Sequence, residues 1–137
     1  MLESENLVNR GGVYYSFNSV LRTTHFDFQL GTGFQWGNVV KNQFYSPQIN
    51  AGIHYGLLQK DKLDVHIGLR YLYSWRRYPF NTQANNHSLY YGYKLTYGSK
   101  LFLSHHLGVG GMMRSDFPYK HRAMLDVILS IGIGYAF

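Results

Sequence analysis

The chain has 137 residues, enough for one domain and too few for two domains with separate cores. Aromatic residues make up 18% of it and charged residues only 15%, below the roughly one quarter typical of soluble domains. The lack of cysteine excludes disulfides and thiolate metal sites, and no stretch approaches the ~18 consecutive apolar residues of a membrane-spanning helix. The net charge of +6 does not indicate nucleic-acid binding, because the basic residues are scattered.

The first ten residues carry no clear element. Met1 to Glu5 is acidic and lacks the apolar core of a secretion signal, so an exported form of this chain would be numbered after removal of its signal. Leu2 to Asn9 makes a poor strand. We therefore expect a single domain over residues 1–137, with an irregular N-terminal segment at 1–10.

Alternation of apolar and polar residues predicts strands almost without interruption from Val13 to the last residue. Seven strands are expected, at 12–21, 25–36, 44–58, 63–78, 87–97, 101–114 and 122–137. Most of them reach the ~9–11 residues that a tilted membrane-spanning strand needs.

The breaks between these strands have two lengths. Short polar breaks, each the size of a tight hairpin turn, lie at 22–24, 59–62 and 98–100. Longer breaks lie at 37–43, 79–86 and 115–121. This asymmetry is typical of outer-membrane β-barrels, which have short periplasmic turns and longer outer loops, and aromatic residues gather near the strand ends, where interfacial girdles would lie.

The two faces of each expected strand differ in polarity. From Leu63 to Trp75 the odd positions are all apolar, whereas the even positions include Asp64, His66 and Arg70. The polar face is also rich in glycine, which suits a narrow interior that bulky side chains would overfill. The predicted fold class is therefore all-β, a transmembrane antiparallel up-and-down barrel, and a soluble lipocalin-like barrel is the alternative.

The last eight residues carry a recognisable motif. Ser130, Gly132, Tyr135 and Phe137 fill a polar position, a glycine position, a hydrophobic third-last position and an aromatic last position. This arrangement resembles the C-terminal β-signal of bacterial outer-membrane barrels, and the strand lengths and loop asymmetry look like those of small OmpA/OmpX-type barrels. The resemblance implies an integral location in the bacterial outer membrane, contact with the lipid bilayer, and insertion by the barrel-assembly machinery.

The number of strands departs from the family pattern. Small bacterial barrels have an even number of strands, eight at least, and only seven are clear here. Three explanations stay open: residues 1–10 supply an irregular eighth strand, the first strand has been lost from this chain, or another segment closes the seam. An open seam would be costly in lipid, where unpaired backbone groups find no water.

The inward face is expected to hold a polar network. Its principal members are Asp27, Asp64, His66, Arg70, Lys94 and Asp126, with Gln29, Gln48, Asn50, His54, Arg76 and His106 beside them. Each buried charge needs a partner in a medium of low dielectric constant. Because side chains just fill a barrel of eight strands or fewer, a plugged lumen is favoured over an ion or solute path.

Catalytic, cofactor and metal sites are not expected. Ser104 and His106 share a face, which raises the alternative of a lipid A-modifying enzyme. A hairpin turn near Pro118 would place Asp126 opposite Gly110, about 13 Å along the strand from His106, so a catalytic triad does not assemble. The remaining histidines are too scattered to predict a metal site.

Basic residues beside aromatic ones at the expected outer rim suit contact with lipopolysaccharide phosphates or a protein partner, and equally suit ordinary solvated loops. They are Arg76, Arg77, Arg114, Lys120 and Arg122. The expected function is a non-enzymatic outer-membrane barrel acting as a scaffold or accessory subunit of a complex with other outer-membrane proteins. A lipid A-modifying enzyme and a narrow channel are the alternatives.

Overall fold

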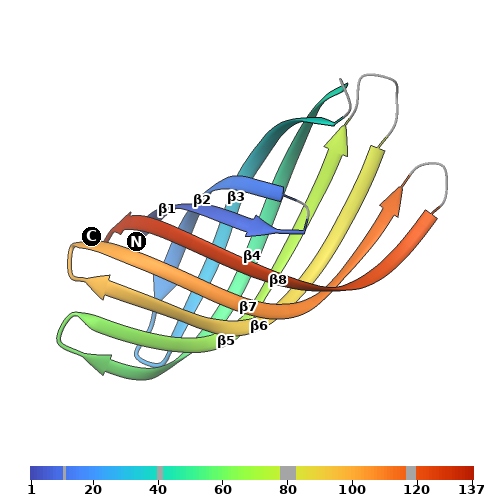
Figure 1. Cartoon of the computed structure of the whole chain (residues 1–137). Coiled ribbons are helices and arrows are strands. Elements are labelled where there is room, and N and C mark those ends of the chain that lie inside the picture. The colour runs from blue at the N-terminus through green and yellow to red at the C-terminus, as the bar shows by residue number, and fades with distance from the viewer. Residues whose placement is uncertain (11, 40–41, 78–82, 117–119) are drawn as a thin grey trace.

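The computed structural model describes residues 1–10, 12–39, 42–77, 83–116 and 120–137, without the side chains at 37–39, 42–43 and 120. Within these ranges the strands are β1 (Leu2–Asn9), β2 (Gly12–Arg22), β3 (Phe26–Val39), β4 (Asn42–Lys60), β5 (Leu63–Arg77), β6 (Gln83–Gly98), β7 (Leu101–Asp116) and β8 (Lys120–Tyr135). Each strand pairs antiparallel with its neighbours in the chain, and β1 pairs with β8, so the sheet is a closed barrel (Figure 1). The predicted fold class is confirmed.

Strand β1 completes the barrel. The expectation that residues 2–9 make a poor strand is wrong, because this segment pairs with β2 along its length and with β8 from Leu2 to Val8. Its alternation escapes notice because Glu3 and Glu5 point inward while the polar side chains of Ser4 and Asn6 point outward. The eighth strand therefore comes from the N-terminal segment of this chain.

The other seven predicted strands are present, several with longer outer ends. Strand β3 continues to Val39, β4 begins at Asn42 and β6 begins at Gln83, so parts of the predicted outer loops are strand, while residues 78–82 and 117–119 of those loops lie outside the described ranges. A hairpin ladder needs backbone hydrogen bonds and not apolar side chains, which is why it continues where the apolar alternation stops. Figure 1 shows β3 to β8 rising beyond the short β1–β2 hairpin.

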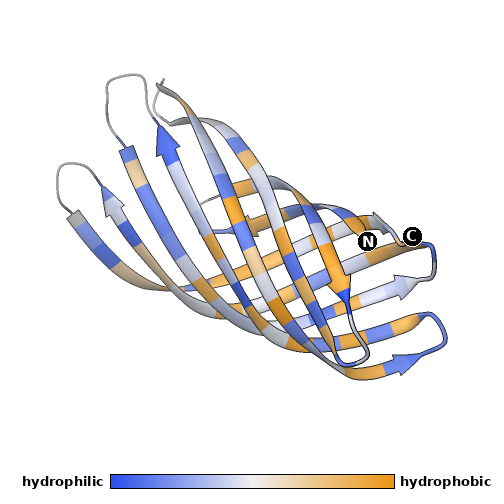
Figure 2. Ribbon diagram, turned by 180° about the vertical axis from the view of Figure 1, so that it is seen from behind, coloured by the Kyte–Doolittle hydropathy of each residue, from blue (hydrophilic) through white to orange (hydrophobic). Residues whose placement is uncertain are grey.

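The outward direction of the apolar faces is confirmed. On β5, Leu69 is 44% exposed and Arg70 is 1% exposed, and on β8, Ile131 is 63% exposed and Asp126 is 4% exposed. Figure 2 shows the corresponding orange and blue segments alternating along the strands. Among the described residues there is no helix that is long and apolar enough to cross a membrane.

Aromatic side chains mark both ends of the apolar exterior. At the outer end, the ring of Trp36 lies 4.5 Å from that of Phe34 and 6.3 Å from that of Tyr45, measured between centroids. At the opposite end, near the termini, Tyr135 and Phe137 meet edge to face at 5.8 Å. These clusters match the two aromatic girdles of a membrane barrel.

Close approach between β6 and β7 requires glycine on the inner face. A Cβ atom on Gly92 would lie 2.0 Å from the carbonyl oxygen of Leu107 and 2.5 Å from the Cα of Gly108. On the outer face of β7, a Cβ atom on Gly111 would meet nothing within 4 Å. Substitutions at Gly92 and Gly111 therefore distinguish a steric clash of the added methyl group from the general effect of replacing a glycine.

We expect Gly92→Ala to lower the free energy of unfolding by about 1–3 kcal/mol, because the new methyl group must push backbone aside. Urea unfolding in lipid vesicles measures this change, and Gly111→Ala is the matched control, with a change near zero. Equal losses in the two variants would contradict the steric explanation.

Candidate functional site

The centre of the lumen holds a buried ion pair that spans the barrel. Glu5 of β1 accepts hydrogen bonds from both terminal nitrogens of Arg70 on β5, one of them at 3.2 Å. The same carboxylate also accepts from Asn18 at 2.9 Å and from Ser130 at 2.8 Å. Since Glu5 and Arg70 are both almost fully buried, four hydrogen bonds compensate the desolvation of this carboxylate.

A second buried pair lies next to the first. Lys94 of β6 donates to Glu3 at 2.9 Å and to Gln29 at 3.4 Å, and Ser104 of β7 donates to the other oxygen of Glu3. Glu3 and Glu5 therefore connect β1 to β5, β6 and β7 across the lumen. These two carboxylates were missing from the predicted network because their strand was not recognised.

Asn50 links the central ion pair to a set of neutral polar side chains. Its amide nitrogen donates to Ser16 at 3.0 Å and to Asn18 at 3.2 Å, and its oxygen accepts from Gln29 at 3.3 Å. The result is a connected polar layer over β2, β3 and β4.

The end of the barrel near the chain termini holds a third charged cluster. Arg22 donates to Asp27 at 2.9 and 3.0 Å and to Asp64 at 2.5 Å. His66 lies beside this cluster, with its Nε2 atom 3.6 Å from Asp27. Two acidic side chains of the predicted network thus share one arginine, and this arginine was not among the predicted members.

Toward the outer side, an apolar layer lies above the central ion pairs. Its members are all fully buried: Leu7, Tyr14, Leu72, Tyr90 and Ile128. The interior therefore holds an apolar layer beside the predicted polar network, because five strands contribute a large apolar or aromatic side chain at this level. Side chains of this size close a barrel of eight strands.

Asp126 sits on the outer side of this layer. It accepts a hydrogen bond from the hydroxyl of Tyr90 at 2.5 Å and from the backbone nitrogen of Arg10 at 3.1 Å. Asn9 donates to the same tyrosine hydroxyl at 3.1 Å. The predicted network is therefore divided, with Asp126 on one side of the apolar layer and Arg70 and Lys94 on the other.

The serine and histidine side chains of the lumen do not form a nucleophile and base. The hydroxyl of Ser104 donates to Glu3, and the ring nitrogens of His54 and His106 have no hydrogen-bond partner among the described residues. The predicted register is confirmed, since Asp126 lies opposite Gly110. Within the described part of the chain, no group of three acidic or histidine side chains is arranged to hold a metal ion.

The basic residues predicted at the rim do not form one cluster. Arg76 is buried and points into the barrel, where it lies 4.1 Å from the ring centroid of Phe44 and donates to Gln35 at 3.2 Å. Arg114 pairs with Asp116 at 2.8 Å. Arg77 and Arg122 are exposed, and the side chain of Lys120 lies outside the described part.

Three residues of the C-terminal motif lie on β8 and divide between its two faces, and Phe137 follows two residues beyond its end. Ser130 and Gly132 face the lumen, where Ser130 contributes to the binding of Glu5. Tyr135 and Phe137 are exposed at the end of the barrel that carries the termini. The motif thus presents an aromatic edge outward while its polar residue belongs to the central ion pair.

We expect Arg70→Met to cost about 3–5 kcal/mol of stability, because it leaves the Glu5 carboxylate buried without a cation. The double variant with Glu5→Gln should recover much of this loss. Urea unfolding in vesicles measures both, and Asp116→Asn at the partly exposed Arg114 pair is the control, with a loss of about 1 kcal/mol or less. A loss for Arg70→Met no larger than that of the control would contradict the role given to the buried pair.

Comparison with known proteins identifies the fold. No family model and no curated protein sequence matches the chain. The crystal structure of Neisserial surface protein A is similar to it over 99% of this chain and 93% of that one, with a TM-score of 0.62 and 12% identity. The crystal structure of a major outer membrane protein from Thermus thermophilus is similar over the full length of both chains, with a TM-score of 0.59 and 14% identity.

Identities this low show a shared fold and no more. The exterior of this chain adds its own evidence, since a closed ladder with outward apolar faces and aromatic ends suits lipid rather than water. The chain is therefore a small, closed, eight-stranded antiparallel β-barrel whose exterior suits a lipid bilayer, and it shares this fold with both of these proteins.

Proposed function

We propose that this barrel is a non-enzymatic scaffold or accessory subunit of an outer-membrane assembly, and that its exterior and rim carry its contacts. The observation that supports this most directly is the filled lumen, in which the cations Arg70 and Lys94 pair with Glu5 and Glu3 beneath the apolar layer. An interior occupied by its own cross-braces offers little space for a solute. Contacts with partners would then be made by the outside of the barrel.

Three kinds of partner belong to this proposal. Exposed Arg77 and Arg122 are suited to lipopolysaccharide phosphates at the outer rim. The exposed Tyr135 and Phe137 are suited to recognition by the barrel-assembly machinery during insertion. Other outer-membrane proteins would contact the apolar wall.

Extraction of the tagged full chain from native outer membranes in mild detergent tests the scaffold role. We expect the chain to migrate in a species larger than the monomer and to retain other outer-membrane proteins, as judged by native electrophoresis and mass spectrometry. Identical membranes with the untagged chain are the control. Migration only as a free monomer would contradict the proposal.

Planar-bilayer recording tests the alternative of a narrow channel. We expect the purified barrel to give no discrete current steps, because an ion would have to cross the apolar layer and displace two buried ion pairs. Detergent without protein provides the baseline. Reproducible steps from the wild-type barrel would favour the channel instead.

A further inference from the structure

Polar side chains on the lipid-facing wall differ between two sectors in whether they have hydrogen-bond partners. On β6 and β7 they bond to tyrosine hydroxyls of neighbouring strands: His87 lies 2.6 Å from that of Tyr71, and His105 lies 3.4 Å from that of Tyr93. On β1 and β2, the exposed side chains of Ser4, Asn6 and Ser19 have no hydrogen-bond partner among the described residues. Exposed serine and asparagine side chains of the described strands that have no hydrogen-bond partner there thus gather on β1 and β2.

Asn6 lies deep in the apolar belt. Its neighbours in the ladder are Tyr15 on β2 and Ile131 on β8. Ile131 is in the middle of an outward row on β8, where every member from Leu125 to Tyr135 is apolar or aromatic. A primary amide at this depth is costly to leave facing hydrocarbon chains, which offer it no hydrogen bond.

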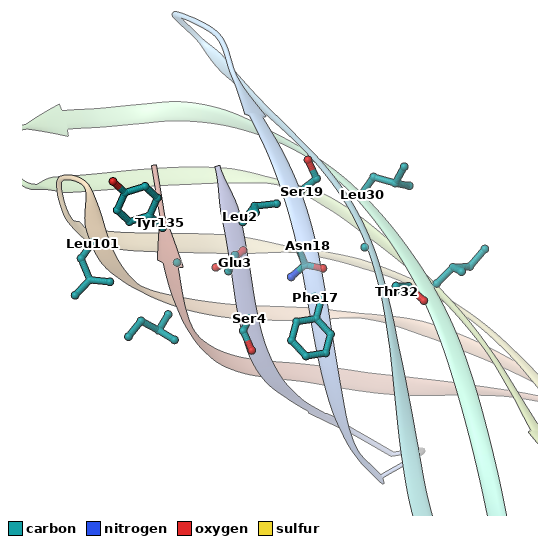
Figure 3. Close-up of a pocket in the computed structure, with 14 residues that line it drawn as sticks. Leu2, Glu3, Ser4, Phe17, Asn18, Ser19, Leu30, Thr32, Leu101 and Tyr135 are labelled. Carbon is teal, nitrogen blue, oxygen red and sulfur yellow. The ribbon is translucent and has the colours of Figure 1, made fainter. Parts of the chain in front are cut away.

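The same sector is hollowed. A depression of about 840 Å³ extends over the outer wall from β7 and β8 across β1 to β4, and Asn6 lies outside its lining. Within it Ser4, Ser19 and Thr32 are small, and the neighbouring Phe17 and Leu30 project outward (Figure 3). Figure 3 shows Ser4 and Phe17 on adjacent strands at the edge of this depression. A surface with a hollow beside projecting side chains can receive the projections of a matching surface.

We propose that the outer face of β1 and β2, centred on Asn6, is the contact surface for a second copy of this chain in the membrane. The inference rests on the proposed scaffold role and names the face and the partner. Two copies related by a two-fold axis along the membrane normal bring Asn6 close to Asn6 of the partner.

A second copy suits this face better than a lipid does. An acyl chain can fill the depression but offers no donor or acceptor to the amide. An identical chain inserted in the same direction presents the same amide at the same depth, and an amide both donates and accepts, so the pair is self-complementary. Side-chain hydrogen bonds and small residues at the contact are the features that hold transmembrane helices together, and the same physical chemistry applies to the outer wall of a barrel.

Single-cysteine cross-linking in lipid vesicles tests the face, since the natural chain contains no cysteine. We expect Ser4→Cys to give a disulfide-linked dimer on mild oxidation, because Ser4 is exposed on β1 next to the proposed axis. Leu89→Cys, exposed on β6, is the matched control and should stay monomeric. Equal cross-linking of the two variants, or none in either, would overturn the inference.

Asn6→Leu tests the amide itself. We expect it to raise the dimer dissociation constant in vesicles about tenfold, measured by fluorescence energy transfer between labelled copies. The folded fraction should not fall, because leucine suits lipid, and Val109→Leu on β7 should change neither quantity. An unchanged dissociation constant in Asn6→Leu would overturn the inference.

Two results distinguish self-association of the chain from its scaffold role. A wild-type chain that is monomeric in vesicles but still retains other proteins on native extraction would overturn the self-association and leave the scaffold role standing. A chain that dimerises in vesicles but retains no other protein would support the self-association and count against the accessory role.

Discussion

The structure depends on the closure of its hydrogen-bond ladder by β1. In hydrocarbon no water reaches an unpaired backbone group, so an open edge between β2 and β8 would leave a row of unsatisfied donors and acceptors. Strand β1 removes this edge with only eight residues. Because it faces the lumen with Glu3 and Glu5, it also supplies the anions that Lys94 and Arg70 require. The same strand therefore closes the wall of the barrel and supplies the anions of its lumen.

Where the exterior is plainly apolar, the sequence is sufficient to predict the fold. In β5 the odd positions from Leu63 to Trp75 are large and apolar and the even ones are polar or small, with Leu72 the exception, so both the strand and the direction of its faces follow. In β1 the same rule fails, because polar residues occupy both faces. The outer ends of β3 and β6 were also missed, since backbone pairing extends a hairpin beyond its apolar positions.

The lumen could be predicted in composition but not in pairing. Burial of Arg70 and Lys94 follows from their position in alternating strands, whereas their partners depend on which strand lies across the barrel. That arrangement requires β1, and the sequence does not clearly predict residues 2–9 to be a strand. The apolar layer was missed for another reason: Leu72 and Tyr90 stand among polar neighbours on the inward face, and periodicity alone cannot show that they meet at one level.

The two-sided polarity of β1 has a different cause on each face. Inside, Glu3 and Glu5 are each matched by a cation and by further hydrogen bonds, so their presence is explained within one chain. Outside, Asn6 stands between Tyr15 and Ile131 with no such match among the described residues. The physical rule that requires partners for buried charges in the lumen also applies to an amide in hydrocarbon. For Asn6 the partner has to come from another molecule, and the residues that made this strand hard to recognise are those that mark its outer face as a contact surface.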